Sequence, residues 1–148
     1  MTENPFAGRK LFTPEQANAA LPLVRAIVKD LADLSREVIE RRERLGELQA
    51  GRERNARGDL YGQELEQIEQ ELEKDTERLQ EYVDELRQLG VEPKNGPEGL
   101  VDFPAMMEGR PVYLCWKLGE PEVLHWHDLE AGFRGRQPLG AATSAGNS

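Results

Sequence analysis

Cysteine is almost absent from this chain of 148 residues, in which Cys115 is the single thiol. One cysteine cannot form an internal disulfide, so the sequence is typical of a reducing compartment and we expect a cytoplasmic protein. Long apolar runs are missing as well. No stretch approaches the ~20 apolar residues of a membrane-spanning helix, so we expect no membrane partner.

Basic residues are outnumbered by acidic ones, 19 against 28, and the net charge is −9. A protein that binds nucleic acid needs a basic face for the phosphate backbone, so nucleic acid is excluded as the main partner. The hydrophobic share of 38% is enough for one small core. We expect a single domain over residues 11–139, between a flexible N-terminus, 1–10, and a disordered tail, 140–148.

Two heptad patterns predict a long antiparallel helical hairpin over residues 13–90. Thr13 is a good N-cap, Pro14 suits the first helical position, and Gln16 completes a capping box. The chain turns near Gly58, and Gly90 ends the second helix. The apolar stripes are Val24, Ile27, Leu31, Leu34, Val38, Leu45 and Leu48 in the first helix, and Leu65, Ile68, Leu72, Leu79, Tyr82, Leu86 and Leu89 in the second.

One charged residue interrupts each stripe, Arg41 in the first helix and Asp75 in the second. Folding the hairpin about Gly58 places these two residues opposite each other. We predict that they form a partly buried ion pair that fixes the register of the helices. Other apolar residues, such as Leu23 and Ile39, widen the stripes, so we expect the C-terminal module or a second copy to cover them. A homodimer through the helices is the expected assembly.

After Gly90 the heptads stop, and glycine, proline, aromatic residues and both histidines appear. Strands are predicted over residues 100–103, 112–118 and 122–127, with a loop at 104–110 and a turn at 119–121. They form a three-stranded antiparallel module within 99–139, and the whole fold is α+β, mainly α. A three-residue turn places Leu114 opposite Trp126 and Leu124 opposite Trp116 on an apolar face, with Cys115 opposite His125 on the other face.

The chain also resembles a known family. The residues that carry the resemblance are FTPEQANAALPLVR near the N-terminus and GLVDFPA…GRPVYLCWKLGEPEVLHWHDLEAGFRGRQPL near the C-terminus. Together they resemble an uncharacterised prokaryotic family, domain of unknown function 2203, from Leu11 to Leu139. The resemblance implies a helical hairpin with a small C-terminal element. It implies no activity and no catalytic residues.

The polar face of the module suggests a metal site. Cys115, His125 and His127 are soft or borderline ligands on one face. We predict that Glu130 supplies a carboxylate as the fourth metal ligand. Asp102, Glu120 and Asp128 are further carboxylates near in sequence. Thiolate with imidazole suits one divalent transition metal, Zn or Fe. The alternative is ordinary: Cys115 is a small buried hydrophobic residue, and the histidines are half-exposed strand residues bonded to carboxylates.

A final segment carries two arginines between glycines, Arg134 and Arg136, which are candidates for binding an anion. Alternatively, they pair with acidic residues while Phe133 anchors the segment.

Three functions stay open. The first is a non-catalytic adaptor or assembly protein that acts on a protein partner through its helical surface. The second is a metal-binding protein. The third is a small enzyme with His127 and Asp128 as acid–base groups near the arginines, and it is less expected because no nucleophile–base pattern is present.

Overall fold

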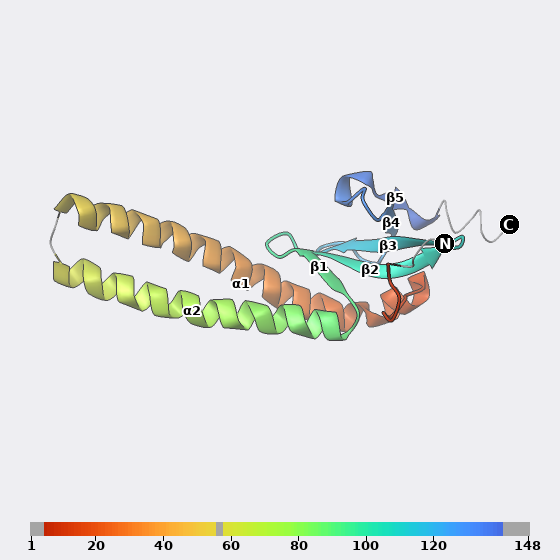
Figure 1. The fold of residues 1–148 in the computed structure, drawn as a ribbon, viewed down its shortest axis with the longest axis horizontal. Coiled ribbons are helices and arrows are strands. Elements are labelled where there is room, and N and C mark those ends of the chain that lie inside the picture. Colours follow the sequence, from red (N-terminus) through yellow and green to blue (C-terminus); the bar gives the residue numbers. More distant parts are fainter. Residues whose placement is uncertain (1–4, 56–57, 141–148) are drawn as a thin grey trace.

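The computed structural model describes residues 5–55 and 58–140, with the side chains of 52–61 left out. Two helices precede one antiparallel sheet, whose strands lie in the order β1-β2-β3-β4-β5 (Figure 1). The turn predicted near Gly58 would fall on residues 56–57, and the predicted tail would fall almost entirely beyond 140, so these two predictions lie outside the described residues. The elements are α1 (Pro14–Asn55), α2 (Gly58–Gln88), β1 (Glu92–Asn95), β2 (Leu100–Met107), β3 (Arg110–Lys117), β4 (His125–Asp128), the short 3₁₀ helix η1 (Phe133–Gly135) and β5 (Gln137–Pro138).

The ends of the hairpin follow the sequence signals. The backbone N–H of Thr13 donates to Oε1 of Gln16 at 3.0 Å, and the N–H of Gln16 donates to Oγ1 of Thr13 at 3.1 Å. These two bonds confirm the predicted capping box at the start of α1. Gly90 has φ of 88°, and the N–H of Val91 donates to the carbonyl of Leu86 at 2.9 Å. This left-handed residue ends α2 and turns the chain into β1.

The hairpin has two apolar regions with a charged contact between them. The guanidinium of Arg41 forms an ion pair with the carboxylate of Asp75, and Glu71 lies 3.5 Å from the same guanidinium. Beyond this contact, at the far end of the hairpin, Leu48 packs with Leu65 and Ile68 in a small separate cluster. The other half of the hairpin belongs to the main core.

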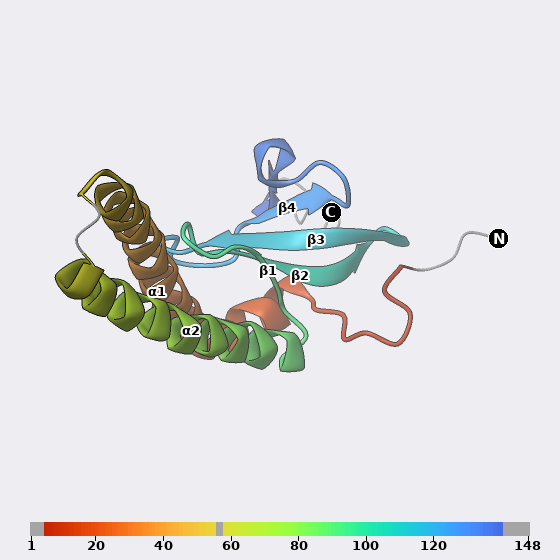
Figure 2. The ribbon, with the colours of Figure 1, turned by 60° about the vertical axis from the view of Figure 1, so that its left-hand side comes forward.

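The main core lies between the first half of α1, the last turns of α2 and one face of the sheet. Figures 1 and 2 show the helices on one face and the C-terminal segment on the other, while the far half of the hairpin projects beyond the sheet. Val28 of α1 is fully buried, so the sheet covers part of the apolar flank, whereas Leu23 and Ile39 stay exposed. The sheet contributes Val101, Phe103 and Ala105 of β2, Val112, Leu114 and Trp116 of β3, and Trp126 of β4.

The sheet differs from the predicted three-stranded module. It has five strands and forms one whole side of the core, so the predictions of three strands and of a mainly α fold are wrong. The first strand, β1, begins at Glu92, before the predicted start of the module at 99. Its sequence, EPKN, has no alternating pattern, and the two residues of β5 are too few to show one.

The second strand is longer than predicted because Pro104 lies inside it. Proline has no N–H to donate, which normally excludes it from a central strand. Here β1 pairs only with residues 100–102, so β2 has a single partner strand at Pro104. The missing donor therefore breaks no bond to β1. The predicted loop at 104–110 is in fact the end of β2, a tight turn and the start of β3.

The register of the last hairpin follows the prediction in part. Leu114 pairs with Trp126 and Cys115 pairs with His125, as predicted. The strand β4 begins only at His125, so the alternation does not extend to the preceding residues. Leu124 is exposed at 42%, and Val123 is buried in its place. Val123 is held against α1 by Asn18, whose Oδ1 accepts a hydrogen bond from the Val123 N–H at 2.7 Å.

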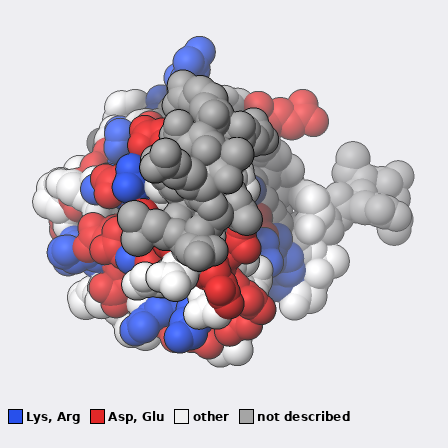
Figure 3. Space-filling view, turned by 90° about the vertical axis from the view of Figure 1, so that its left-hand side faces the viewer, with Lys and Arg blue, Asp and Glu red and all other residues white. Residues whose placement is uncertain are grey.

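The surface of the hairpin is polar. In Figure 3, which looks onto the end of the hairpin, acidic and basic side chains alternate around the described part of the surface. Among the described residues, no helix is long and apolar enough to cross a membrane.

Candidate metal centre

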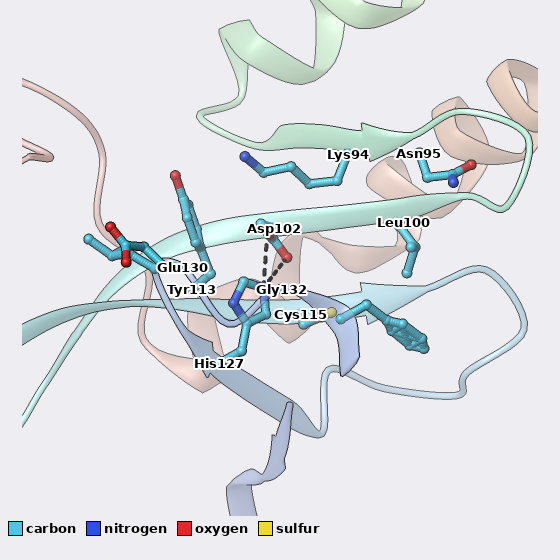
Figure 4. Close-up of a pocket in the computed structure, with 11 residues that line it drawn as sticks. Lys94, Asn95, Leu100, Asp102, Tyr113, Cys115, His127, Glu130 and Gly132 are labelled. Carbon is cyan, nitrogen blue, oxygen red and sulfur yellow. Dashed lines mark hydrogen bonds and ion pairs between the residues drawn. The ribbon is translucent and has the colours of Figure 1, made fainter. Parts of the chain in front are cut away.

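Three side chains from three strands meet on the face of the sheet that points away from the helices. Asp102 of β2 pairs directly with Cys115 of β3, and His127 of β4 pairs with Tyr113 of β3. Because side chains two residues apart share a face, Cys115, His127 and Asp102 all lie on one side. Figure 4 shows the carboxylate of Asp102 above the imidazole of His127, with the sulfur of Cys115 beside them.

The three side chains are close together and almost completely buried. One ligand atom from each, a carboxylate oxygen, Sγ and a ring nitrogen, lies within 4.8 Å of the other two. The exposed fractions are 4% for Asp102, 2% for Cys115 and 2% for His127. Nε2 of His127 lies 3.0 Å from Oδ1 and 3.1 Å from Oδ2 of Asp102. Buried polar groups of this kind must be paired to be stable, and here they are paired with one another.

The second ring nitrogen of His127, Nδ1, is hydrogen-bonded to the backbone. Nδ1 lies 2.7 Å from the backbone carbonyl of Asp128, which can only accept, so Nδ1 carries a proton and donates it. This bond fixes the orientation of the ring and leaves Nε2 as the nitrogen that faces Asp102. A histidine that ligates a metal is typically held in this way, with its other ring N–H on a carbonyl or carboxylate.

Without a metal, the site carries a proton on both nitrogens of His127. Burial alone would lower the pKa of His127, but the hydrogen bonds with Asp102, Cys115 and the Asp128 carbonyl raise it to about 10. The imidazolium and the Asp102 carboxylate then form a buried ion pair at neutral pH. A metal ion that takes the Nε2 position must displace this proton.

A cavity of about 290 Å³ lies against these three side chains. Its lining includes Leu129 and Phe133 of the C-terminal segment, which crosses the outer face of the sheet (Figure 1). Part of the N-terminal segment also packs on this face: Phe6 is 2% exposed, and its ring centroid lies 5.2 Å from that of Tyr113. The three side chains are thus buried themselves, and they line a pocket that is partly open to solvent, with the exposed residues Lys94 and Glu130 at its edge.

The second predicted histidine does not join the group. His125 turns toward Glu120, with its Nδ1 at 3.7 Å from Oε2 of that carboxylate. Arg136 lies against the same carboxylate, with Nη1 at 3.0 Å from Oε1 and Nη2 at 2.7 Å from Oε2. Its guanidinium also stacks over the ring of Phe133, 4.1 Å from the centroid. Hydrogen bonding to Glu120 raises the pKa of Arg136, and Cys115 contributes to the same shift.

The remaining predicted residues lie at the edge of the site. Glu130 lines the cavity but is exposed, and Figure 4 places it at the rim, on the far side of Tyr113 from Cys115. Arg134 is exposed on η1, while Arg136 has an internal carboxylate as its partner. The two arginines therefore do not converge on a common point. The structure gives Asp102 the place that the sequence analysis assigned to Glu130.

The sequence offered one signal for Asp102. It lies in an otherwise apolar run, LVDFPA, where an acidic residue is costly unless it has a partner. That signal becomes decisive only when the register is known, because the pairing of β2 with β3 sets Asp102 beside Cys115.

Comparison with known proteins places the chain in a family without assigning a chemistry. No curated protein and no solved structure is significantly similar to it. Residues 10–139, nearly the whole described chain, match the family of uncharacterized conserved proteins DUF2203. The match agrees with the family resemblance found in the sequence. The chain belongs to the DUF2203 family.

Proposed function

We propose that this protein binds one divalent transition metal ion, zinc or iron(II), through Asp102, Cys115 and His127. The observation that carries the proposal is the buried convergence of three different ligand types within 4.8 Å. Carboxylate, thiolate and imidazole are the ligands that such metals take in proteins. A hydrophobic core alone would be served better by apolar side chains, since a buried ion pair adds little net stability.

The orientation of His127 separates this proposal from a thiol enzyme. In a nucleophile–base–orienter set, one ring nitrogen faces the nucleophile and the other faces the orienting carboxylate. Here the carboxylate of Asp102 faces Nε2, and Nδ1 donates to the Asp128 carbonyl. His127 also hydrogen-bonds Cys115, but no carboxylate among the described residues orients the ring from the nitrogen opposite Asp102, as a catalytic triad requires. The arrangement favours a ligand set over an acid–base pair.

Titration with cobalt(II) tests the proposal, because a cobalt–thiolate bond gives an intense near-ultraviolet band and d–d bands that report coordination number. The metal-stripped wild type is compared with Asp102→Asn, Cys115→Ser and His127→Gln. His125→Gln is the matched control, since His125 lies on the same strand but faces Glu120. We expect the thiolate band in the wild type and the control. It should be lost in Cys115→Ser and strongly weakened in the other two variants.

An absent thiolate band in the wild type, or equal loss in the control, would contradict the proposal. Displacement of the bound cobalt by zinc then compares the affinities of the site for these two metals. An anaerobic titration with iron(II) gives the affinity for iron. Circular dichroism of each variant separates lost ligation from lost folding.

The projecting half of the hairpin favours a second role, docking a protein partner or a second copy of this chain. This half has its own small core and takes no part in the candidate metal centre. The predicted homodimer can be tested by sedimentation equilibrium of the wild type and of Ile39→Glu. Dissociation of a wild-type dimer by this charge would support the helices as the contact surface, and a monomeric wild type would contradict the homodimer.

A further inference from the structure

The metal centre proposed above is short of ligands. Asp102, Cys115 and His127 supply three, whereas zinc takes four and iron(II) takes more. The other two ligands predicted from the sequence are placed elsewhere: His125 faces Glu120, and Glu130 is exposed at the cavity rim. Structural zinc sites are closed by four protein ligands, while sites that act on a ligand keep one position open.

The open position faces the cavity. The three ligand residues all line this space of about 290 Å³, and its apolar lining comes from Leu100, beside Asp102 on β2, and from Leu129 and Phe133 of the C-terminal segment. A molecule that enters can therefore reach the metal and pack its apolar part against these walls. The volume limits the occupant to a small molecule.

One cation at this cavity is free to change partners. Lys94 of β1 is exposed, and its Nζ lies 3.3 Å from Oε2 of Glu92 and 4.9 Å from the centroid of Tyr113 (Figure 4). Glu92 has two other partners, Arg9 at 3.0 Å and the hydroxyl of Tyr113 at 3.2 Å. Lys94 can thus turn toward a ligand without leaving a buried carboxylate unpaired.

We infer that the cavity binds a small monoanion with a carboxylate-like head group, which occupies the open metal position while Lys94 neutralises its charge. This inference rests on the proposed metal site. A single charge is favoured because Lys94 is the one lysine among the described residues that line the cavity, and Glu130 at the rim repels anions of higher charge. The apolar walls favour a short hydrocarbon group on the anion.

The test is a titration of the cobalt(II)-loaded protein with azide and with acetate, followed by the visible d–d bands. A small anion that enters the coordination sphere changes these bands in a saturable way. We expect such a change in the wild type. In Lys94→Met the affinity for both anions should fall roughly tenfold, the effect of losing one charged hydrogen bond, with the cobalt affinity unchanged. Lys94→Arg should recover much of the loss.

The matched control is Lys74→Met, which removes the same charge from the middle of α2, away from the cavity. If neither azide nor acetate changes the d–d bands of the cobalt-loaded protein, the inference is overturned. The proposed metal site would then remain, as a centre that no external anion reaches. Equal weakening in the Lys74 and Lys94 variants would overturn the role of Lys94. Failure of cobalt to bind at all would refute the proposed function, and this inference would fall with it.

Discussion

His127 and Asp102 lie on strands that do not pair with each other, yet Nε2 of the histidine is 3.0 Å from Oδ1 of the aspartate. The strand between them, β3, carries Cys115 next to Asp102. Three adjacent strands thus bring an acid, a thiol and an imidazole to one buried point. Without a metal, a shared proton holds the acid and the imidazole together, and that proton is what a metal ion would replace.

Removal of one partner of this pair should destabilise the metal-free protein strongly. In Asp102→Asn, the buried imidazole loses the carboxylate that compensates its charge, because an amide cannot neutralise an imidazolium. Loss of one member of a buried ion pair costs about 3–5 kcal/mol. Urea unfolding of metal-stripped protein measures the change.

The control for this variant is Asp128→Asn, which breaks an exposed pair with Arg110 at 3.3 Å. Exposed pairs contribute about 0–1 kcal/mol, so the control should unfold close to the wild-type midpoint. Similar midpoints for the two variants would contradict a charged His127–Asp102 pair that contributes more than an exposed pair does.

The ion pair inside the hairpin should behave differently from the one in the sheet. Arg41→Leu leaves Asp75, 17% exposed, without its main partner, and we expect a loss of about 1–3 kcal/mol. The double variant Arg41→Leu/Asp75→Leu should return to within about 1 kcal/mol of the wild type, because apolar residues would join the stripe that the charges interrupt.

A double-mutant cycle by urea unfolding measures this coupling. Lys29→Leu, which breaks an exposed i,i+4 pair with Asp33, is the control and should change the free energy of unfolding by less than about 0.5 kcal/mol. Additive losses in the double variant would show that Arg41 and Asp75 are energetically independent, and the role in register would then be lost.

Acid should weaken the contact that holds the C-terminal segment. Burial alone would raise the pKa of Glu120, but hydrogen bonds from Arg136 and the Lys117 backbone, with the charges of Arg136 and His125, lower it. A carboxyl with a lowered folded pKa contributes stability above its unfolded pKa, about 4.3, and this contribution is lost as the pH falls through the folded value.

The measurement is the free energy of unfolding of the wild type and of Glu120→Gln between about pH 6 and pH 3. The amide does not titrate, so the advantage of the wild type should shrink as the pH falls. An advantage that stays constant across this range would mean that Glu120 is not ionised in the contact with Arg136.

Local signals in the sequence predicted the helices well and the sheet only in part. Thr13, Gln16 and Gly90 mark helix ends because their chemistry acts within a few residues. The edge strands β1 and β5 carry no such signal, since they are fixed by pairing with β2 and β4 rather than by their own side chains. The same holds for Pro104, whose place in a strand depends on where β1 ends.

The candidate metal centre was likewise predictable where local sequence signals fix it and not where strand pairing or side-chain partners fix it. Alternation along β3 and β4 predicted that Cys115 lies opposite His125, and the register confirms it. Which histidine meets the thiol depends on side-chain conformation: His127 hydrogen-bonds Asp102, whereas His125 turns toward Glu120, 3.7 Å away, without a hydrogen bond at Nδ1. Asp102 comes from a strand whose register the sequence alone did not set. The carboxylate that lies with the thiol and the imidazole is therefore Asp102, whereas the sequence pointed to Glu130.

The most direct test of the central claim is the metal content of the protein purified without an affinity tag, measured by elemental mass spectrometry beside Cys115→Ser and His125→Gln. We predict about one zinc or iron per chain in the wild type and in His125→Gln, and little in Cys115→Ser. A wild type that carries no metal and takes up none on reconstitution would contradict the claim. The group of Asp102, Cys115 and His127 would then be a buried ion pair beside a thiol.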